Sequence, residues 1–393
     1  MPPDRPAPED SAQPRWLWQA AGWPGFVHDA ACVSRALSEA RMAQGRLIGT
    51  TDALGGSGRL PTEQWVWTDE AIATAAIEGE ALDPAAVRSS VARRLGLEGP
   101  RVGASRAVEG LLDVMQDAAQ GWDRPLDRDR LFRWQAALFP TGRSGLRDIV
   151  TGAWRGGPEP MQIVSGPQGR ETVHFEAVPA PAVDAEMRGL LAWFDATLDG
   201  RALDGLVRAA IAHLWFETIH PFEDGNGRVG RVLVDLAIAQ DVRAPWRMHG
   251  LSKRLLADRA GYYDALNRAQ RGDVDITPWL TWFLGTFTAA CRDSLVVVEE
   301  AVERSQYWSR FRERSLSEHQ RKALGRMLDA GRGRFEGGMT VRKFASLAGV
   351  SRTTAFRELA DLAAKGMLVS VGSGRATRYE LPMPDWRWRP AAR

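Results

Sequence analysis

The sequence predicts a mainly α-helical protein with one β-hairpin in its middle and a separate module at its C-terminus. Apolar residues recur at helical spacing through most of the chain. Two short alternating runs, residues 161–164 and 172–175, flank the turn-rich segment 165–170 and predict the hairpin. Near the C-terminus, three helical segments precede two short strands.

The composition is that of a globular protein with more than one domain. The chain has 393 residues, of which 44% are apolar and 25% charged. No window approaches 18 consecutive apolar residues, and the first dozen residues lack the apolar core of a secretory signal. Cys32 and Cys291 cannot build a disulfide framework and belong to no metal-binding cluster. We therefore expect a cytoplasmic protein with no membrane contact.

Basic charge is concentrated at the C-terminal end of the chain. The whole chain has a net charge of +2, yet residues 307–393 contain 18 Arg and Lys against 8 Asp and Glu, a balance of +10. The other 306 residues therefore carry a net charge of −8. Such an uneven distribution indicates either a module that binds a polyanion or a solvated basic tail.

Residues 1–115 form an N-terminal helical region that begins with a tryptophan cluster. Trp16, Trp18 and Trp23 are expected to anchor a core. Five glycines predict a break between two helices: Gly45, Gly49, Gly55, Gly56 and Gly58. The next helix is predicted over residues 68–79, with Thr68 as its N-cap and Gly79 at its C-terminal end.

Three further parts follow this region. Residues 116–291 make up a helical middle domain that contains the hairpin, and residues 292–314 a linker helix. The C-terminal module spans residues 315–386, with helices over 320–330, 340–348 and 351–365 and strands over 367–371 and 377–381. The second and third helices are joined through Gly349 as in a helix-turn-helix, so we predict a winged helix.

The strongest functional signal is residues 220–231, HPFEDGNGRVGR. An amphipathic helix is expected to end before His220, and another to begin near Arg228. The turn at residues 225–227 and the start of the second helix would direct several backbone N–H groups to one point, which makes an anion site. Arg228 and Arg231 add two guanidinium groups for phosphate oxygens.

The same segment supplies a metal ligand and a base. Asp224 offers a hard oxygen to Mg²⁺, which commonly takes one or two carboxylates together with phosphates. His220 has a near-neutral reference pKa and is expected to be the general base. These residues suit phosphoryl or nucleotidyl transfer to a hydroxyl. A metal hydrolase that uses His220, Glu223 and Asp224 as ligands is the alternative, which Pro221 and the glycine turn disfavour.

The segment matches the signature of the Fic family, HPFx(D/E)GNGRxxR, at all nine specified positions. The resemblance implies a mainly α-helical Fic core and a protein adenylyltransferase. By this resemblance, His220 deprotonates a Ser, Thr or Tyr hydroxyl of a target protein, which attacks the α-phosphorus of ATP. AMP stays on the target, pyrophosphate leaves, and Asp224 holds Mg²⁺. Family members that phosphorylate carry Lys at the position of Gly227, so glycine favours adenylylation.

The resemblance also assigns the residues around the nucleotide and the target. The expected ATP-binding residues are Asp224, Gly225, Asn226, Gly227, Arg228, Gly230, Arg231, Tyr262 and Tyr263. For each tyrosine alone, core packing is an equal alternative. The hairpin resembles the family's flap, which aligns a target segment by main-chain pairing, here through Met161, Gln162, Ile163 and Val164. The partners are thus ATP and an unidentified protein, and a homo-oligomer is left open.

Residues 74–79 match a second family pattern, the inhibitory (S/T)xxxE(G/N). Thr74 and Glu78 are four residues apart and share one helix face. By the resemblance, the Glu78 carboxylate pairs with Arg231 and takes the place of the γ-phosphate, which inhibits the resting enzyme. In some relatives the equivalent Glu also positions water to remove AMP, so the reverse activity is a further possibility. A solvated helix end is the alternative for Glu78.

The C-terminal module is expected to bind DNA through its third helix. The expected contacts are Arg352, Thr353, Thr354 and Arg357 on the exposed side of that helix and Arg375 on the wing. Phe356 is expected to face the core. Two alternatives stay open: a transcription regulator whose Fic domain is a nucleotide-dependent sensor, and a winged helix that binds protein or mediates dimerisation.

Overall fold

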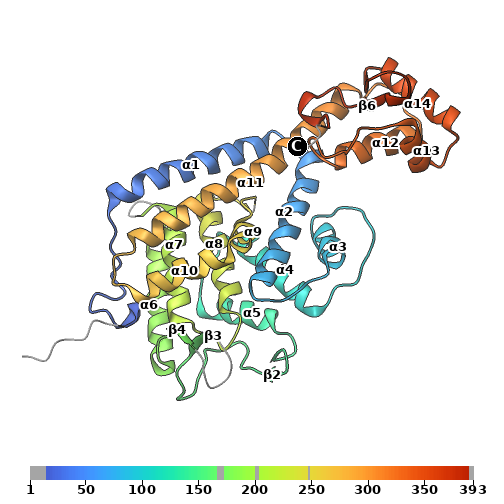
Figure 1. Cartoon of the computed structure of the whole chain (residues 1–393). Helices are drawn as coiled ribbons and strands as arrows, with labels where there is room; N and C mark the ends of the chain where they lie inside the picture. Colours follow the sequence, from blue (N-terminus) through green and yellow to red (C-terminus); the bar gives the residue numbers. More distant parts are fainter. Residues whose placement is uncertain (1–14, 166–171, 200–202, 247, 389–393) are drawn as a thin grey trace, which may run out of the picture. The chain divides into compact units, whose positions relative to one another are not determined.

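The computed structural model describes residues 15–165, 172–199, 203–246 and 248–388 (Figure 1). It divides into two units, one made of Met1–Asp52 and Arg59–Leu295, the other of Ala53–Gly58 and Val296–Arg393. Among the described residues, no helix combines the length and the apolar character that crossing a membrane requires.

The first unit is almost entirely helical, as predicted. Its elements in chain order are η1 (Leu17–Gln19), α1 (Ala30–Asp52), α2 (Gly55–Ile77) from Arg59 onward, α3 (Pro84–Arg94), α4 (Arg106–Gln120), α5 (Arg128–Leu138), β1 (Arg143–Ser144), β2 (Arg147–Asp148), β3 (Gln162–Ser165), β4 (Thr172–Glu176), η2 (Ala180–Ala182), α6 (Val183–Ala196), α7 (Gly205–Ile219), α8 (Asn226–Val242), α9 (Leu251–Ala257), α10 (Arg259–Arg271) and the first part of α11 (Thr277–Arg310). The short β1–β2 pair was not predicted from the sequence.

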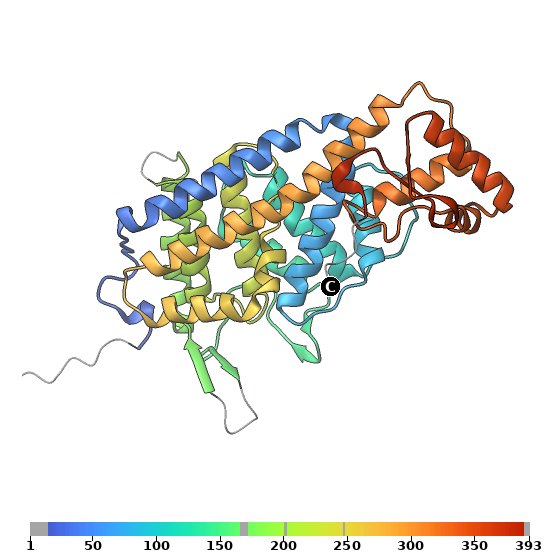
Figure 2. The same ribbon diagram turned by 45° about the horizontal axis from the view of Figure 1, so that its top comes forward.

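The helices α7 and α8 lie side by side at the centre of this unit (Figure 1, Figure 2). All 15 residues of α7 are buried, so the expectation of an amphipathic helix was wrong. Its charged side chains are accommodated because they find partners inside the protein. Arg208, for example, donates to the carbonyl oxygen of Phe194 at 2.6 Å and to Gln240 at 3.0 Å. The central pair is thus enclosed on all sides.

The predicted hairpin is present and is anchored by the N-terminal tryptophans. β3 and β4 pair antiparallel, with an irregularity between Ile163 and Val164. Trp16 packs edge-to-face on Phe175 of β4, with ring centroids 5.5 Å apart, and Trp18 donates to the carbonyl oxygen of Glu176 at 2.8 Å. Residues 166–171 of the expected turn lie outside the described residues. The tryptophan cluster therefore fixes the base of the hairpin.

The helix predicted over residues 68–79 begins earlier, at Gly55, so Thr68 is not its N-cap. Thr68 lies inside α2 and is buried, and packing of that face extends the helix beyond its expected start. The expected glycine break is wrong in detail, because Gly45 and Gly49 lie inside α1 and the other three glycines lie inside α2, so that the helices are separated only by residues 53–54. At the other end the prediction holds: Gly79 adopts a left-handed φ of 81°, and its N–H donates to Ala76.

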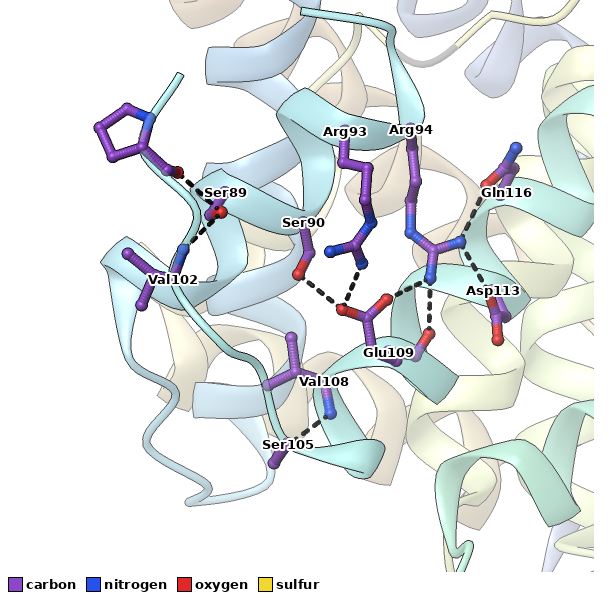
Figure 3. A network of polar contacts seen from close by, with 11 residues as sticks. Ser89, Ser90, Arg93, Arg94, Val102, Ser105, Val108, Glu109, Asp113 and Gln116 are labelled. Atoms are coloured by element: carbon purple, nitrogen blue, oxygen red, sulfur yellow. Dashed lines mark hydrogen bonds and ion pairs between the residues drawn. The ribbon is translucent and has the colours of Figure 1, made fainter. Parts of the chain in front are cut away.

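A charged network joins α3 to α4, the two helices that follow α2 (Figure 3). The Glu109 carboxylate accepts hydrogen bonds from Ser90 at 2.6 Å and from Arg93 and Arg94 at 2.7 Å each. Burial alone would raise the pKa of Glu109, but these three bonds lower it to about 2. The network fixes the helix that continues the chain beyond Glu78.

The second unit contains the predicted three helices and hairpin. They are α12 (Glu318–Asp329), α13 (Val341–Ala348), α14 (Arg352–Ala364), β5 (Val369–Val371), η3 (Gly374–Ala376), β6 (Arg378–Glu380) and η4 (Pro384–Trp386). Phe344, Leu324 and Leu359 are among the buried residues of its core. Backbone bonds between Met339 and Tyr379 tie the start of α13 to β6. The elements fit a winged helix, an assignment that stays a prediction.

Two expectations for the C-terminal half were wrong. The linker helix at residues 292–314 is not separate, because α11 continues from Thr277 to Arg310. Its buried positions form one uninterrupted helical stripe: Leu280, Leu284, Phe287, Cys291, Leu295 and Val298. Phe356 does not face the core and is 56% exposed, since the neighbouring Ala355 and Leu359 occupy the buried side of α14.

Glycine-to-alanine substitutions should distinguish a helical glycine that packs against a neighbouring helix from one that has open space around it. A Cβ on Gly110 of α4 would lie 1.8 Å from the carbonyl oxygen of Ala137. We expect Gly110→Ala to lower the free energy of unfolding by ~1–3 kcal/mol or more. Gly49 has open space around it, so Gly49→Ala should raise that free energy by ~0.5–1 kcal/mol. Urea unfolding of the full chain measures both, and equal stability of the two variants would contradict the α4–α5 contact.

Candidate functional site

The predicted loop lies between α7 and α8, at residues 220–225. His220 ends α7 in the left-handed region, with φ 52°, and its N–H donates to Phe216 at 2.9 Å. The Asn226 side chain closes the loop by accepting from the N–H of Phe222 at 2.9 Å and donating to its carbonyl oxygen at 2.8 Å. Phe222 is buried against Trp154, with ring centroids 5.1 Å apart. The second helix therefore starts two residues before the predicted Arg228.

Arg155 holds this loop from behind, a role that no sequence pattern indicated. Its guanidinium donates to the carbonyl oxygens of His220 at 2.7 Å, of Ile219 at 3.2 Å and of Val178. Its backbone N–H donates to Pro221 at 2.8 Å. Arg155 is buried, which lowers its pKa to about 10 and leaves it charged at neutral pH. One buried cation thus fixes the unusual backbone at His220.

The His220 side chain is well placed to act as a base. It is 15% exposed, and its Nδ1 lies 3.7 Å from a carboxylate oxygen of Glu217. Burial, with the Arg155 guanidinium nearby, lowers the pKa of His220 to about 4. The imidazole is therefore neutral at pH 7 and has a lone pair available for a proton.

The start of α8 has the form of an anion site. Gly225 has φ 88°, and the nearest atom of Phe139 would lie 2.8 Å from a Cβ placed there. The described residues provide no side-chain cap for α8, unlike α3, α4, α5 and α7. Its first N–H groups can consequently bind an external anion. We call the N–H groups of residues 226–228, together with the guanidinium groups of Arg228 and Arg231, the anion site.

Both arginines of the anion site are paired with carboxylates of one segment. Arg231 donates to Glu78 at 2.7 Å and to the hydroxyl and carbonyl oxygens of Thr74 at 2.8 and 3.0 Å. Burial lowers the pKa of Arg231, but Glu78 outweighs this and raises it. Arg228 pairs with Glu80 at 3.0 Å. The predicted Thr74–Glu78–Arg231 cluster is present, whereas the sequence analysis missed Glu80, although a second carboxylate directly after Gly79 was a visible signal.

Glu78 also lies across the turn of the motif. A Cβ on Gly227 would be 2.3 Å from the Glu78 carboxylate. The side chain of Glu78 is 32% exposed, while that of Arg231 is 3% exposed. The carboxylate thus covers the part of the anion site nearest Gly227.

Asp224 could bind a cation only if further ligands, such as nucleotide phosphates, came from outside the protein. Its carboxylate accepts from the N–H of Gly225 at 2.6 Å and from the hydroxyl of Ser144. Glu223 is directed elsewhere, since it accepts from the N–H of Val150 at 3.1 Å. The described residues contain no group of three His, Cys, Asp or Glu that could hold a metal alone. One half-buried carboxylate beside an anion site fits Mg²⁺ that arrives with nucleotide phosphates.

Three predicted nucleotide residues are not part of the anion site. Tyr262 is buried, and its hydroxyl lies 2.9 Å from Nε2 of His213, as the core-packing alternative requires. Tyr263 is half-buried and donates to the carbonyl oxygen of Ile77 at 3.4 Å. Gly230 faces Glu217, whose carboxylate would lie 2.3 Å from a Cβ. A nucleotide contact stays a prediction for all three.

The predicted target-binding residues of β3 and the predicted DNA-binding residues of α14 differ in their exposure. Met161 and Ile163 pack toward the tryptophan cluster, while Gln162 and Val164 are exposed. Within the residues that the structure describes, the sheet consists of β3 and β4, and no further strand pairs with β3. Arg352, Thr353, Thr354 and Arg357 are all exposed on α14. The side chain of Arg375 lies outside the described part of the structure.

Comparison with protein-family models gives three matches. Residues 16–97 match a domain of unknown function, DUF4172, and residues 125–238 match the Fic/DOC family. Residues 337–382 match the C-terminal domain of the DIP2311-like transcriptional regulators. The second match contains the whole of the HPFEDGNGRVGR segment.

Curated relatives match the chain over part of its length. A probable protein adenylyltransferase of Aquifex aeolicus is 30% identical over 107 residues, 27% of this chain and 30% of the relative. A protein adenylyltransferase of Caenorhabditis elegans is 32% identical over 102 residues, 25% of this chain and 18% of the relative. The chain therefore spans less than a third of the length of these relatives.

Among solved structures, a Fic family protein from Desulfovibrio desulfuricans G20 has the same fold. It is 23% identical, with a TM-score of 0.50, and the match covers 89% of this chain and 95% of that one. At this identity the likeness concerns the fold.

Proposed function

This chain is a Fic family protein, and we propose that it is a protein adenylyltransferase, which transfers AMP from ATP to a Ser, Thr or Tyr hydroxyl of a target protein. The observation that carries the proposal is a neutral, half-buried His220 on the loop that leads into an uncapped helix start with two arginines. A base beside a polyphosphate site is what nucleotidyl transfer to a hydroxyl requires.

In the proposed reaction, the imidazole of His220 takes the proton of the target hydroxyl. The hydroxyl oxygen then forms a bond to the α-phosphorus of ATP. The bond between that phosphorus and the bridging oxygen breaks, and pyrophosphate leaves with the electron pair. The N–H groups of residues 226–228 and the two arginines bind the phosphates through charge-assisted hydrogen bonds. Asp224 would hold Mg²⁺, which when bound neutralises phosphate charge.

We further propose that the segment around Glu78 inhibits this activity. The contacts of Glu78 with Arg231 and of Glu80 with Arg228 support the proposal, because both arginines already have carboxylate partners. A γ-phosphate bound at Arg231 would have to displace Glu78. Since the carboxylate is adjacent to the anion site, it could also orient water for removal of AMP, the reverse activity. Main-chain pairing of a target segment with β3 completes the proposal.

A second candidate function is DNA binding by the C-terminal module. It is favoured by the exposed Arg352, Thr353 and Arg357 on α14 and by the match to a transcriptional regulator domain. The +10 balance of residues 307–393 suits a polyanion. An adenylyltransferase with a DNA-binding module and a regulator with a nucleotide sensor share this feature and differ in whether AMP is transferred.

The base assignment predicts the behaviour of His220→Ala. This variant should bind ATP with unchanged affinity, because the anion site is built by residues after the histidine. AMP transfer should fall by ~10²–10⁴-fold, the usual contribution of a general base. Calorimetry measures ATP binding, and α-labelled ATP measures transfer to lysate proteins. His319→Ala, in the other unit, is the control and should behave as wild type. Equal labelling by His220→Ala and wild type would show that another group is the base.

The inhibitory contact predicts that Glu78→Gly raises AMP transfer strongly. Removing the carboxylate frees Arg231, and breaking a largely buried pair has a larger effect than the ~0–1 kcal/mol of an exposed one. Glu78→Asp should relieve inhibition in part. Glu80→Gln should give a smaller rise, because Glu80 is more exposed than Glu78. Arg231→Ala should not activate, since it also removes a phosphate ligand. Initial rates of AMP transfer, measured with α-labelled ATP, test these expectations. Glu98→Gly, which removes an exposed carboxylate elsewhere, is the control. Identical rates for wild type and Glu78→Gly would refute the inhibition.

The DNA-binding candidate predicts affinity for duplex DNA that falls steeply with salt. Each neutralised phosphate contributes roughly −0.9 to the slope of log affinity against log salt. The double variant Arg352→Ala/Arg357→Ala of the full chain should reduce that slope by about 2. Arg35→Ala, on an exposed surface of the first unit, should leave it unchanged. Fluorescence anisotropy between low and physiological salt measures the slopes. Absence of DNA binding at low salt would contradict this candidate and favour a module that binds protein or mediates dimerisation.

A further inference from the structure

The last turn of α7 places a second ionisable side chain behind His220. Glu217 and His220 are three residues apart, and Oε2 of Glu217 faces Nδ1 of His220 at 3.7 Å. The Glu217 side chain is 5% exposed and that of His220 is 15% exposed. Among the described residues, Nδ1 of His220 and Oε1 of Glu217 have no hydrogen-bond partner. The oxygen that faces Nδ1 is Oε2, while the unpartnered Oε1 lies at Gly230. A buried Nδ1 without a partner beside a buried carboxyl group requires an explanation.

The surroundings hold the Glu217 carboxylate in this place. A Cβ on Gly230 of α8 would lie 2.3 Å from Oε1, so the carboxyl group fills the space above a residue without a side chain. Gln270 of α10 donates to the backbone oxygen of Glu217 at 3.1 Å. The carboxyl group cannot turn outward without leaving this packed position. On the Oε1 side, Nδ1 of His213 would lie 3.2 Å from the same Cβ, and on the Oε2 side lies the imidazole of His220.

We propose that Glu217 is the positioning residue of His220: it faces Nδ1, so that Nε2 is directed to the target hydroxyl, and it accepts a hydrogen bond from Nδ1 once the imidazole carries two protons. A base that is itself oriented by a third group is the general arrangement for activating a hydroxyl. Hydrogen bonds of this kind are often long before substrate binds, and 3.7 Å needs to shorten by less than ~1 Å to reach the usual range.

This inference rests on the proposed function and adds no chemical step to it. His220 takes the hydroxyl proton at Nε2, the oxygen–phosphorus bond forms, and pyrophosphate leaves with its electron pair. Glu217 keeps its own atoms and touches neither substrate. Its part is to favour the tautomer with hydrogen on Nδ1 and to stabilise the positive imidazolium that the proton transfer creates.

The charged groups around the pair set a pH dependence. Burial raises the pKa of Glu217 to about 8, although Arg231 of α8 acts in the other direction. Tyr262 of α10 also faces it, with a pKa that burial raises well above 10. Arg155 lowers the pKa of His220 further, whereas the backbone of Glu217, the Glu78 carboxylate in the turn after α2, and Asp224 raise it. Because Glu217 ionises as pH rises through about 8, its effect on the imidazole should increase from pH 7 to 9.

The test uses Glu217→Gln, which keeps the shape of the side chain but cannot ionise. In the full chain with Glu78→Gly as background, kcat for AMP transfer should rise between pH 7 and 9. Glu217→Gln should lose this rise and about 10²-fold of kcat at pH 9, the lower end of a general-base contribution. The KM for ATP should not change. Glu217→Asp, which keeps a carboxylate, should restore the rise in part.

The matched control is Glu109→Gln, which removes the carboxylate that joins α3 to α4 and so costs stability away from His220. A merely structural role of Glu217 predicts that both Gln variants lower the urea midpoint and leave the pH profile unchanged. Glu109→Gln should do so, and Glu217→Gln should not. A retained pH rise and unchanged kcat in Glu217→Gln would overturn the proposal.

A second readout does not depend on AMP transfer. The imidazole ¹⁵N shifts of His220, assigned by comparison with His220→Ala, report which nitrogen carries the proton. At pH 9 we expect Nδ1 to be protonated in the wild type and this preference to be reduced in Glu217→Gln. That change without AMP transfer by any variant would reject the proposed function and support the positioning role. The same tautomer in both proteins would overturn the positioning role.

Discussion

Arg231 is a buried cation, and its charge constrains everything that stands around it. A guanidinium with a 3% exposed side chain needs anions or dipoles close by. Within this chain, Thr74 of α2 and Glu78 in the turn after α2 supply them. When a polyphosphate is bound, its oxygens can supply them instead. In this structure the requirement is met by the contacts of Arg231 with Thr74 and Glu78.

The loop before α8 depends on a second buried cation. Arg155 donates to the carbonyl oxygens of Val178 and of the consecutive residues Ile219 and His220, and this fixes the left-handed backbone of His220. This arrangement keeps positive charge behind the imidazole, which favours its neutral form. The two buried arginines therefore have different effects: Arg155 holds the loop at His220, and Arg231 belongs to the anion site that Glu78 covers in this structure.

Carboxylates complete the electrostatics around the motif, each at a different depth. Glu217 is buried beside His220, Glu78 is partly exposed at Arg231, and Glu80 is more exposed at Arg228. Exposure decides what each can do, because a phosphate chain can replace a carboxylate that can move into solvent. In the proposed function, a bound phosphate chain displaces Glu78 and Glu80 in this way. Glu217 is enclosed between α7 and α8 and stays with the imidazole.

The sequence alone determined the helical fold, the hairpin, the His220–Arg231 segment and the Thr74–Glu78 pair. Each is a local pattern, set by residue spacing within one helix or turn. Only the tertiary structure decided how far α2 and α11 extend, that α7 is buried on every side, and that Phe356 is exposed. It alone brought Arg155, Glu80 and Glu217 to the site. These depend on packing between segments distant in sequence, or on which face of a helix meets its neighbours, and neither is contained in local periodicity.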